Sequence, residues 1–120
     1  MEEPREATSL LAEAATQGLK VHSRDGDHLG QIKALMLDKR SGQAAYAILS
    51  LGGFLGLNKS YYPLPFSLLS YDPGEDFYLI TIDRRVLEGG PSWANHSPEF
   101  NQAYADRVSN YYGTPPVNVS

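Results

Sequence analysis

Two histidines near the start of the chain are the residues best suited to chemistry. His22 and His28 flank an Asp25-Gly26 pair, and Asp27 directly precedes the second histidine. Imidazole and carboxylate groups that meet across a tight turn can bind a metal ion such as zinc or nickel. No recognised ligand spacing accompanies these residues. We therefore interpret them as polar groups that flank a turn and predict no metal site, and we keep a sensor of metal or small ligands at the His22/His28 corner as an alternative.

A glycine-rich segment in the middle of the chain shares only its glycines with a phosphate-binding loop. Residues 52–57 read GGFLGL, but a P-loop needs Lys-Ser or Lys-Thr directly after its last glycine, at the start of a helix. Here Lys59 and Ser60 come later and lead into Tyr61 and Tyr62, which are typical of a strand. We therefore predict an apolar, conformationally permissive loop at this place, and no phosphate site.

The acidic residues form neither a catalytic nor a calcium-binding pattern. Their spacing does not match an EF-hand loop, and carboxylates in turns ordinarily stabilise the turn itself. The sequence also lacks cysteine and any recognisable arrangement of a nucleophile with a base. We therefore expect no enzymatic activity and no bound cofactor. The acidic residues in predicted turns are Asp25, Asp27, Asp38, Asp72, Glu75 and Asp76.

Composition and charge limit the remaining classes of function. The chain has 120 residues, of which 42% are apolar, as is typical of a single folded domain. Its net charge is −4 and it has no run of Lys or Arg, so we expect no direct contact with nucleic acid or with an anionic membrane. No stretch approaches about 18 apolar residues, so we expect no membrane insertion. Because the N-terminus also lacks the apolar core of a signal peptide, we expect a cytoplasmic protein.

Short strands in the middle of the chain must position the polar groups. Tight turns are predicted at Asp25-Gly26, at residues 38–42 and at residues 72–76, where Asp, Pro and Gly supply turn geometry. The strand at residues 44–51 is apolar on both faces, which is typical of a strand that is covered on both sides. These strands and turns indicate a small sheet that curls to cover its own face.

Two irregularities predict where this sheet bends and where it ends. The apolar alternation slips by one position near residues 33–35, which indicates a β-bulge. Pro63 and Pro65 cannot donate ladder hydrogen bonds, so the strand through Tyr61 and Tyr62 is predicted to lie at an edge. The four residues that follow fit one short helical turn.

Helical segments are predicted at both ends of the chain. Apolar residues recur at helical spacing from Ala7 to Ala14, which predicts a short N-terminal helix. Residues 83–88 fit a single helical turn. Ser97 is the predicted N-cap of a longer C-terminal helix that ends at Gly113.

The central strand, loop and strand, residues 43–65, read QAAYAILSLGGFLGLNKSYYPLP. With LGQI at 29–32, LMLD at 35–38 and YDP at 71–73, this pattern resembles a PRC-barrel domain over roughly residues 18–88. That family is named for the cytoplasmic part of the photosynthetic reaction-centre H subunit and is similar to the C-terminal domain of ribosome maturation factors. The resemblance implies a small β-barrel that docks on a larger protein or ribonucleoprotein complex.

We therefore expect a mainly β protein. The predicted fold is a small PRC-type barrel of about five to six antiparallel strands, with a short N-terminal helix and a C-terminal helical extension. The expected boundaries are 1–17 for the N-terminal helical segment, 18–88 for the barrel and 89–120 for the extension with one helix.

We predict a non-enzymatic protein-interaction module that docks on itself, as a homodimer, or on a larger complex of unknown identity. The apolar loop and nearby aromatic residues would make the contact. Two alternatives stay open: Phe54 and Leu57 fold back to plug the barrel, or the barrel interior binds a small ligand. The predicted partner-binding residues are Gly52, Gly53, Phe54, Leu55, Gly56, Leu57, Tyr61, Tyr62 and Trp93.

Overall fold

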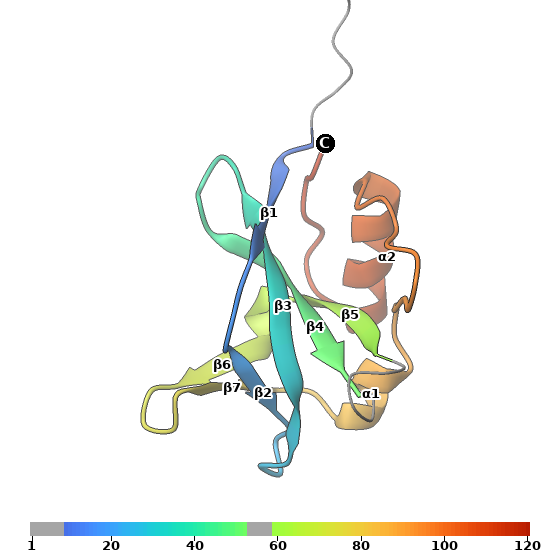
Figure 1. Ribbon diagram of the computed structural model, residues 1–120. Coiled ribbons are helices and arrows are strands. Elements are labelled where there is room, and N and C mark those ends of the chain that lie inside the picture. Colours follow the sequence, from blue (N-terminus) through green and yellow to red (C-terminus); the bar gives the residue numbers. More distant parts are fainter. Residues whose placement is uncertain (1–8, 53–58) are drawn as a thin grey trace, which may run out of the picture.

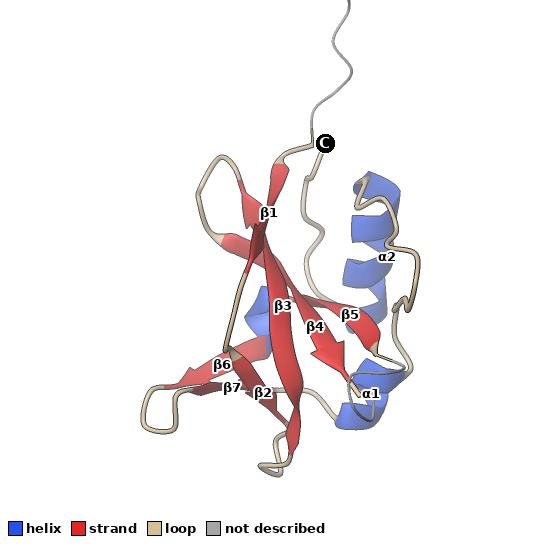
Figure 2. Ribbon diagram, viewed as in Figure 1, coloured by secondary structure: helices blue, strands red, loops and turns tan. Residues whose placement is uncertain are grey.

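A curled β-sheet is the main structural unit of the described chain, and two described α-helices pack against it (Figure 1; Figure 2). The computed structural model describes residues 9–52 and 59–120. The strands are β1 (Leu11–Ala15), β2 (Lys20–His22), β3 (His28–Asp38), β4 (Ala44–Leu51), β5 (Ser60–Pro65), β6 (Leu69–Asp72) and β7 (Phe77–Ile80). The helical elements are the short 3-10 turn η2 (Phe66–Leu68), α1 (Arg84–Glu88) and α2 (Gln102–Tyr112).

The sheet is a half-barrel built around the long strand β3. Its strands follow the order β5-β4-β3-β2-β7-β6, and β1 also pairs with β3. β4 lies along one side of β3, while β2 and β1 follow one another along the other side. The β2–β7 pair is parallel and the other pairs are antiparallel.

The predicted mainly β fold is confirmed, but its strand count and strand directions differ from the prediction. About five to six antiparallel strands were expected, and the described residues form a mixed, seven-stranded sheet. The difference comes from β1, which the prediction treated as helix, and from the parallel β2–β7 pair. The latter joins segments far apart in the sequence, so no local turn signal marks it.

The predicted N-terminal helix is wrong where the structure describes it. Residues Leu11–Ala15 form β1, which pairs with β3 from the Leu11↔Asp38 pair to the Ala15↔Ala34 pair. This part of β3 extends beyond β2 and has backbone donors and acceptors that need partners. β1 supplies them, whereas a helix this short is marginal on its own. Ala7, the first residue of the predicted helical stripe, lies outside the described residues.

The three predicted turns are confirmed, and they join β2 to β3, β3 to β4 and β6 to β7. In the β3–β4 turn, Gly42 has a φ of 75°, a conformation that favours glycine. The Asp38 carboxylate in the same turn accepts hydrogen bonds from the Arg40 backbone N–H (2.7 Å) and from its guanidinium (3.0 Å). These hydrogen bonds from Arg40 lower the pKa of Asp38 to about 2.

The predicted β-bulge is confirmed at Lys33. The register with β4 shifts between Ile32 and Ala34. The shift changes which residues share a face. Ile32 and Leu35 pack against one hydrophobic cluster, whereas Ala34 and Met36 belong to another. Lys33 itself is exposed.

These two hydrophobic clusters lie on opposite faces of β4. Ala47 and Leu49 belong to the inner cluster, which fills the curled side of the sheet, and Tyr46 and Ile48 belong to the outer cluster. This confirms that β4 is covered on both faces. The buried residues of the inner cluster are Val21, Ile32, Ala47, Leu49, Leu64, Leu69, Ile80 and Leu87. Those of the outer cluster are Leu11, Ala34, Met36, Tyr46, Ile48, Ala105, Val108 and Val119.

Helix α2 and the C-terminal segment cover the outer cluster. Ala105 and Val108 of α2 and Val119 of the C-terminal segment are buried in it. The backbone N–H of Leu10 donates to the Val119 carbonyl at 2.9 Å. The C-terminal end of the chain therefore lies beside the start of β1, as Figure 1 shows.

Helix α2 begins at Gln102, so the predicted start near Ser97 is wrong. The N-cap is Asn101, whose side-chain oxygen accepts a hydrogen bond from the Tyr104 backbone N–H at 3.0 Å. Because Asn101 caps the helix directly, the residues before it lie outside the helix, where Phe100 packs against the outer cluster.

Other predicted element ends are confirmed. Gly113 ends α2 with a φ of 67°, and the helical turn predicted at residues 83–88 is α1, for which Asp83 is the N-cap. β5, which carries Pro63 and Pro65, lies at one edge of the sheet, and η2 follows it. Within the described residues, no helix is both long and apolar enough to cross a membrane.

Candidate functional site

The outer face of the sheet is covered over one part and open over another. α2, the C-terminal segment and Trp93 pack on the outer cluster. Beyond this cluster, strands β2 to β5 carry polar side chains on the same face. We call this surface the lysine face. Its residues are Lys20, Gln31, Lys33, Ser50, Lys59 and Tyr61.

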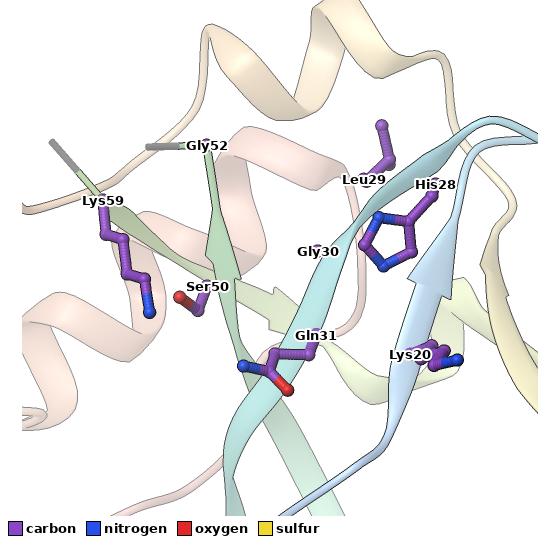
Figure 3. A pocket seen from close by; sticks show the side chains of 8 residues that line it. All are labelled: Lys20, His28, Leu29, Gly30, Gln31, Ser50, Gly52 and Lys59. Atoms are coloured by element: carbon purple, nitrogen blue, oxygen red, sulfur yellow. The ribbon is translucent and has the colours of Figure 1, made fainter. Parts of the chain in front are cut away.

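Four residues of the lysine face form a row across neighbouring strands. Lys20 on β2 lies opposite Gln31 on β3. Gln31 lies opposite Ser50 on β4, which in turn lies opposite Tyr61 on β5. Neighbouring strands are about 4.8 Å apart, so this row spans roughly 14 Å. Figure 3 shows Lys20, Gln31 and Ser50 in this order, with Lys59 beside Ser50.

Two adjoining hollows lie along this row. One has a volume of about 410 Å³ and the other about 310 Å³. Gln31, Ser50 and Lys59 line both hollows, Lys20 lines the first, and Lys33 lines the second. No carboxylate from the described part of the chain lines either hollow. The surface is therefore a shallow trough of mixed polar and apolar character, with the side chains of three lysines along it.

The positive charge of the lysine face is concentrated, and among the described residues no carboxylate forms a salt bridge with its lysines. The lysine face contains three of the four lysines of a chain whose net charge is −4. The described ion pairs lie elsewhere, between Asp38 and Arg40 and between Arg84 and Glu88. The trough therefore attracts negatively charged groups, although the chain as a whole is acidic.

A close approach of two strands shapes one end of the trough. A Cβ atom built on Gly30 would lie 2.1 Å from the Ser50 carbonyl oxygen and 2.9 Å from Leu51 Cδ2. Only glycine allows β3 and β4 to approach this closely. Ser50 is largely buried, with 8% of the residue exposed.

Tyr61 lies at the edge of the lysine face and is held from two sides. Its backbone exchanges hydrogen bonds with Trp93 at 2.8 and 3.0 Å, and the two rings are 6.0 Å apart. The Lys33 ammonium lies 4.3 Å from the centre of the Tyr61 ring, which is a cation–π contact. Trp93 also packs at 6.5 Å from Tyr104 of α2. Tyr61 and Trp93 thus join the lysine face to the covered part of the sheet.

The predicted partner-binding residues divide into three groups. Gly52 is exposed at the end of β4, and Tyr61 and Trp93 lie together as described above. Tyr62 points to the other face and packs against the inner cluster, so the structure does not bring it to the same surface. Residues 53–57 lie outside the described residues. The partner-binding role of all these residues stays a prediction.

The histidine corner forms a small aromatic stack. The rings of His22 and His28 are 5.2 Å apart, and His22 stacks on Phe77 at 4.0 Å. His22 Nδ1 lies 3.0 Å from the Gly26 carbonyl oxygen, within hydrogen-bonding distance. In the described ranges, no group of three or more His, Cys, Asp or Glu residues could hold a metal ion. Nothing in this geometry favours the alternative of a sensor at this corner.

Buried tyrosines lie between α2 and the sheet. The Tyr46 hydroxyl is within hydrogen-bonding distance of Ser109 Oγ, at 3.1 Å. Burial raises the pKa of Tyr46, of Tyr104 and most strongly of Tyr112. The Tyr104 and Tyr112 hydroxyls are buried without a hydrogen-bond partner in the described part of the chain. These groups pack the helix against the sheet and open onto neither hollow.

The sequence prediction missed most of the lysine face. Lys20, Gln31, Lys33 and Ser50 carry no motif, and they lie on three strands that only the register brings together. A signal was present in Ser50, a polar residue within an otherwise apolar strand, and in the Gln31 and Lys33 positions beside the bulge. Converting that signal into a surface requires the pairing of four strands.

The half-barrel with its curled mixed sheet defines the class of protein, a small β-barrel-like domain with a helical extension. The PRC-barrel domain family matches residues 16–87, which is more than half of the chain. The chain belongs to the PRC-barrel family, and the predicted resemblance is confirmed. No curated protein matches the chain at a significant level. At the level of the family, membership indicates a protein-interaction module.

Proposed function

We propose that this chain is a non-enzymatic interaction module that docks on another protein, or on a second copy of itself, through the lysine face. The proposal rests on one observation, that only part of the outer face of the sheet is buried. α2 and the C-terminal segment bury one part of it, and a row of polar side chains occupies the other. This open part sits on paired strands, which hold a binding surface more rigidly than loops do.

The composition of the lysine face supports docking rather than chemistry. Its side chains are cationic or neutral, and within the described residues no carboxylate lies along the hollows to act as a base beside Ser50. The interior of the half-barrel is occupied by the inner cluster, which leaves the outer surface as the place for contact. We further propose a cytoplasmic location, with which the lack of cysteine is compatible.

Site-specific crosslinking tests this proposal. The chain has no cysteine, so Gln31→Cys introduces a single attachment point for a photoreactive group at the centre of the lysine face. Ser70→Cys on β6 is the matched control, because it is also exposed but lies at the other end of the strand order. Light scattering of the purified protein at increasing concentration measures self-association separately.

We expect the Gln31→Cys protein to form one crosslinked product of defined mass in an extract of the source cell, or with itself. The Ser70→Cys protein should not form this product. Equal crosslinking from both positions, or none from Gln31→Cys together with a monomer at every concentration, contradicts the proposal.

A further inference from the structure

We propose that the lysine face binds an extended, acid-rich segment of the partner protein. This inference rests on the proposed function and adds the chemistry of the partner. It starts from the three lysines of this face, two of which lie on strands while the third directly precedes a strand. Lys20 is on β2, Lys33 is at the bulge of β3, and Lys59 directly precedes β5.

The spacing of the outer lysines fits an extended peptide. Lys20 and Lys59 lie on or beside strands that are three positions apart in the sheet order, which is roughly 14 Å. In an extended segment, side chains on one face recur about every 6.6 Å, so acidic residues at positions i, i+2 and i+4 span about 13 Å. A segment with alternating acidic residues therefore places one carboxylate near each end of the trough and one near Lys33.

Neutral hydrogen-bonding groups lie between the lysines. The Gln31 amide can both donate and accept, and the Ser50 hydroxyl can do the same. Both line the two hollows. Such groups can pair with the backbone of an extended peptide, while the lysines contact its side chains. Such a surface can recognise both the negative charge and the extended backbone of a peptide.

An acidic protein segment fits this surface better than a nucleic acid does. Nucleic-acid affinity is built from many phosphate contacts, typically about six to ten, and the lysine face offers three lysines. The chain as a whole is acidic, with a net charge of −4. A long polyanion would meet this repulsion, whereas a short segment can stay within the trough.

The fourth lysine provides a matched control. Lys39 lies in the β3–β4 turn, away from the lysine face, and its ammonium donates to the Ser9 carbonyl at 2.9 Å. Lys39→Glu and Lys59→Glu change the net charge of the chain by the same amount. Any effect of overall charge is therefore common to both variants, and a specific effect appears only for Lys59→Glu.

The binding experiment uses a labelled peptide of about seven residues in which Glu alternates with Ser. Fluorescence anisotropy measures its affinity for the full chain, and a peptide with Gln in place of Glu is the control. We expect the Glu peptide to bind and the Gln peptide to bind at least about tenfold more weakly. Lys33→Glu and Lys59→Glu should each lower the affinity for the Glu peptide about five- to tenfold. Lys39→Glu should lower it less than about twofold.

Three results would overturn the inference. The first is equal binding of the Glu and Gln peptides. The second is an equal loss of affinity for the Glu peptide in Lys39→Glu and Lys59→Glu. The third is tighter binding of an oligonucleotide of similar length than of the Glu peptide. Thermal unfolding of each variant shows that a lost affinity is not a lost fold. If Gln31→Cys crosslinks a partner while the Glu peptide fails to bind, the docking function stands and its acidic partner does not.

Discussion

Replacing Gly30 with alanine tests whether the close approach of β3 and β4 supports the lysine face. In an ordinary strand position, Gly→Ala stabilises by about 0.5 to 1 kcal/mol. Here the added Cβ would lie 2.1 Å from the Ser50 carbonyl oxygen, which is backbone and cannot move alone. The strands have to separate, and overpacking of this kind costs about 1 to 3 kcal/mol.

The expected result is therefore a loss of stability where the ordinary rule predicts a gain. For a chain of this size, a loss of about 1 to 3 kcal/mol lowers the melting temperature by roughly 4 to 12 °C. Chemical denaturation and thermal unfolding followed by circular dichroism measure it. Gly74→Ala is the control, because its Cβ would meet only Asp72 Oδ1 at 3.4 Å, an ordinary contact.

A Gly30→Ala protein as stable as the parent, or more stable, would show that the close approach of β3 and β4 does not require glycine. The variant also links packing to binding. If the close approach holds Gln31 and Ser50 in one row, Gly30→Ala should also lower the affinity of the protein for the Glu peptide. Gly74→Ala should leave this affinity unchanged.

Three further predictions concern the rest of the fold. Asn101→Ala removes the N-cap of α2 and should lower the free energy of unfolding by about 1 kcal/mol. Ser97→Ala should change this free energy little. Equal effects of the two substitutions would contradict the observed helix start. The pKa of Asp38 is depressed in the folded state, so its stabilising contribution is complete above its ordinary pKa near 3.8 and is lost as the pH falls towards about 2. Asp38→Asn should therefore destabilise the protein clearly at pH 6 and much less at pH 2, as urea unfolding at both pH values would show. Tyr112→Phe should leave the melting temperature unchanged or raise it, because the hydroxyl is buried without a partner in the described residues; a clear fall would reveal a missing hydrogen bond.

Local signals in the sequence were sufficient for the turns and for the bulge. Gly42 and the turn around Asp38 depend only on a few adjacent residues, and so does the phase slip at Lys33. The end of α2 at Gly113 is local in the same sense. These features were predicted because each is determined within about one turn of chain.

Features that depend on distant partners were not predicted. The spacing of apolar residues before Ala15 fits a helix, and only the unpaired half of β3 makes it a strand. The start of α2 differs for a related reason, since both Ser97 and Asn101 can act as N-caps and tertiary packing of Phe100 decides between them. Tyr61 and Tyr62 looked alike in the sequence and point to opposite faces.

The lysine face lies beyond local prediction for the same reason. Its row joins residues from four strands, and the register of each pair must be known before Lys20 and Tyr61 can be assigned to one surface. The predicted partner-binding loop begins at Gly52, which lines the first hollow, so the predicted and observed surfaces meet there. The partner-binding role of the remaining loop residues stays a prediction.

Hydrogen–deuterium exchange of the chain alone and in complex with its crosslinked partner tests the docking surface most directly. We expect slower exchange in residues 16–20, 30–33 and 59–61, where the lysine face lies, and no change in β6 and β7. Slower exchange confined to β6 and β7, or to the exposed surface of α2, would contradict it.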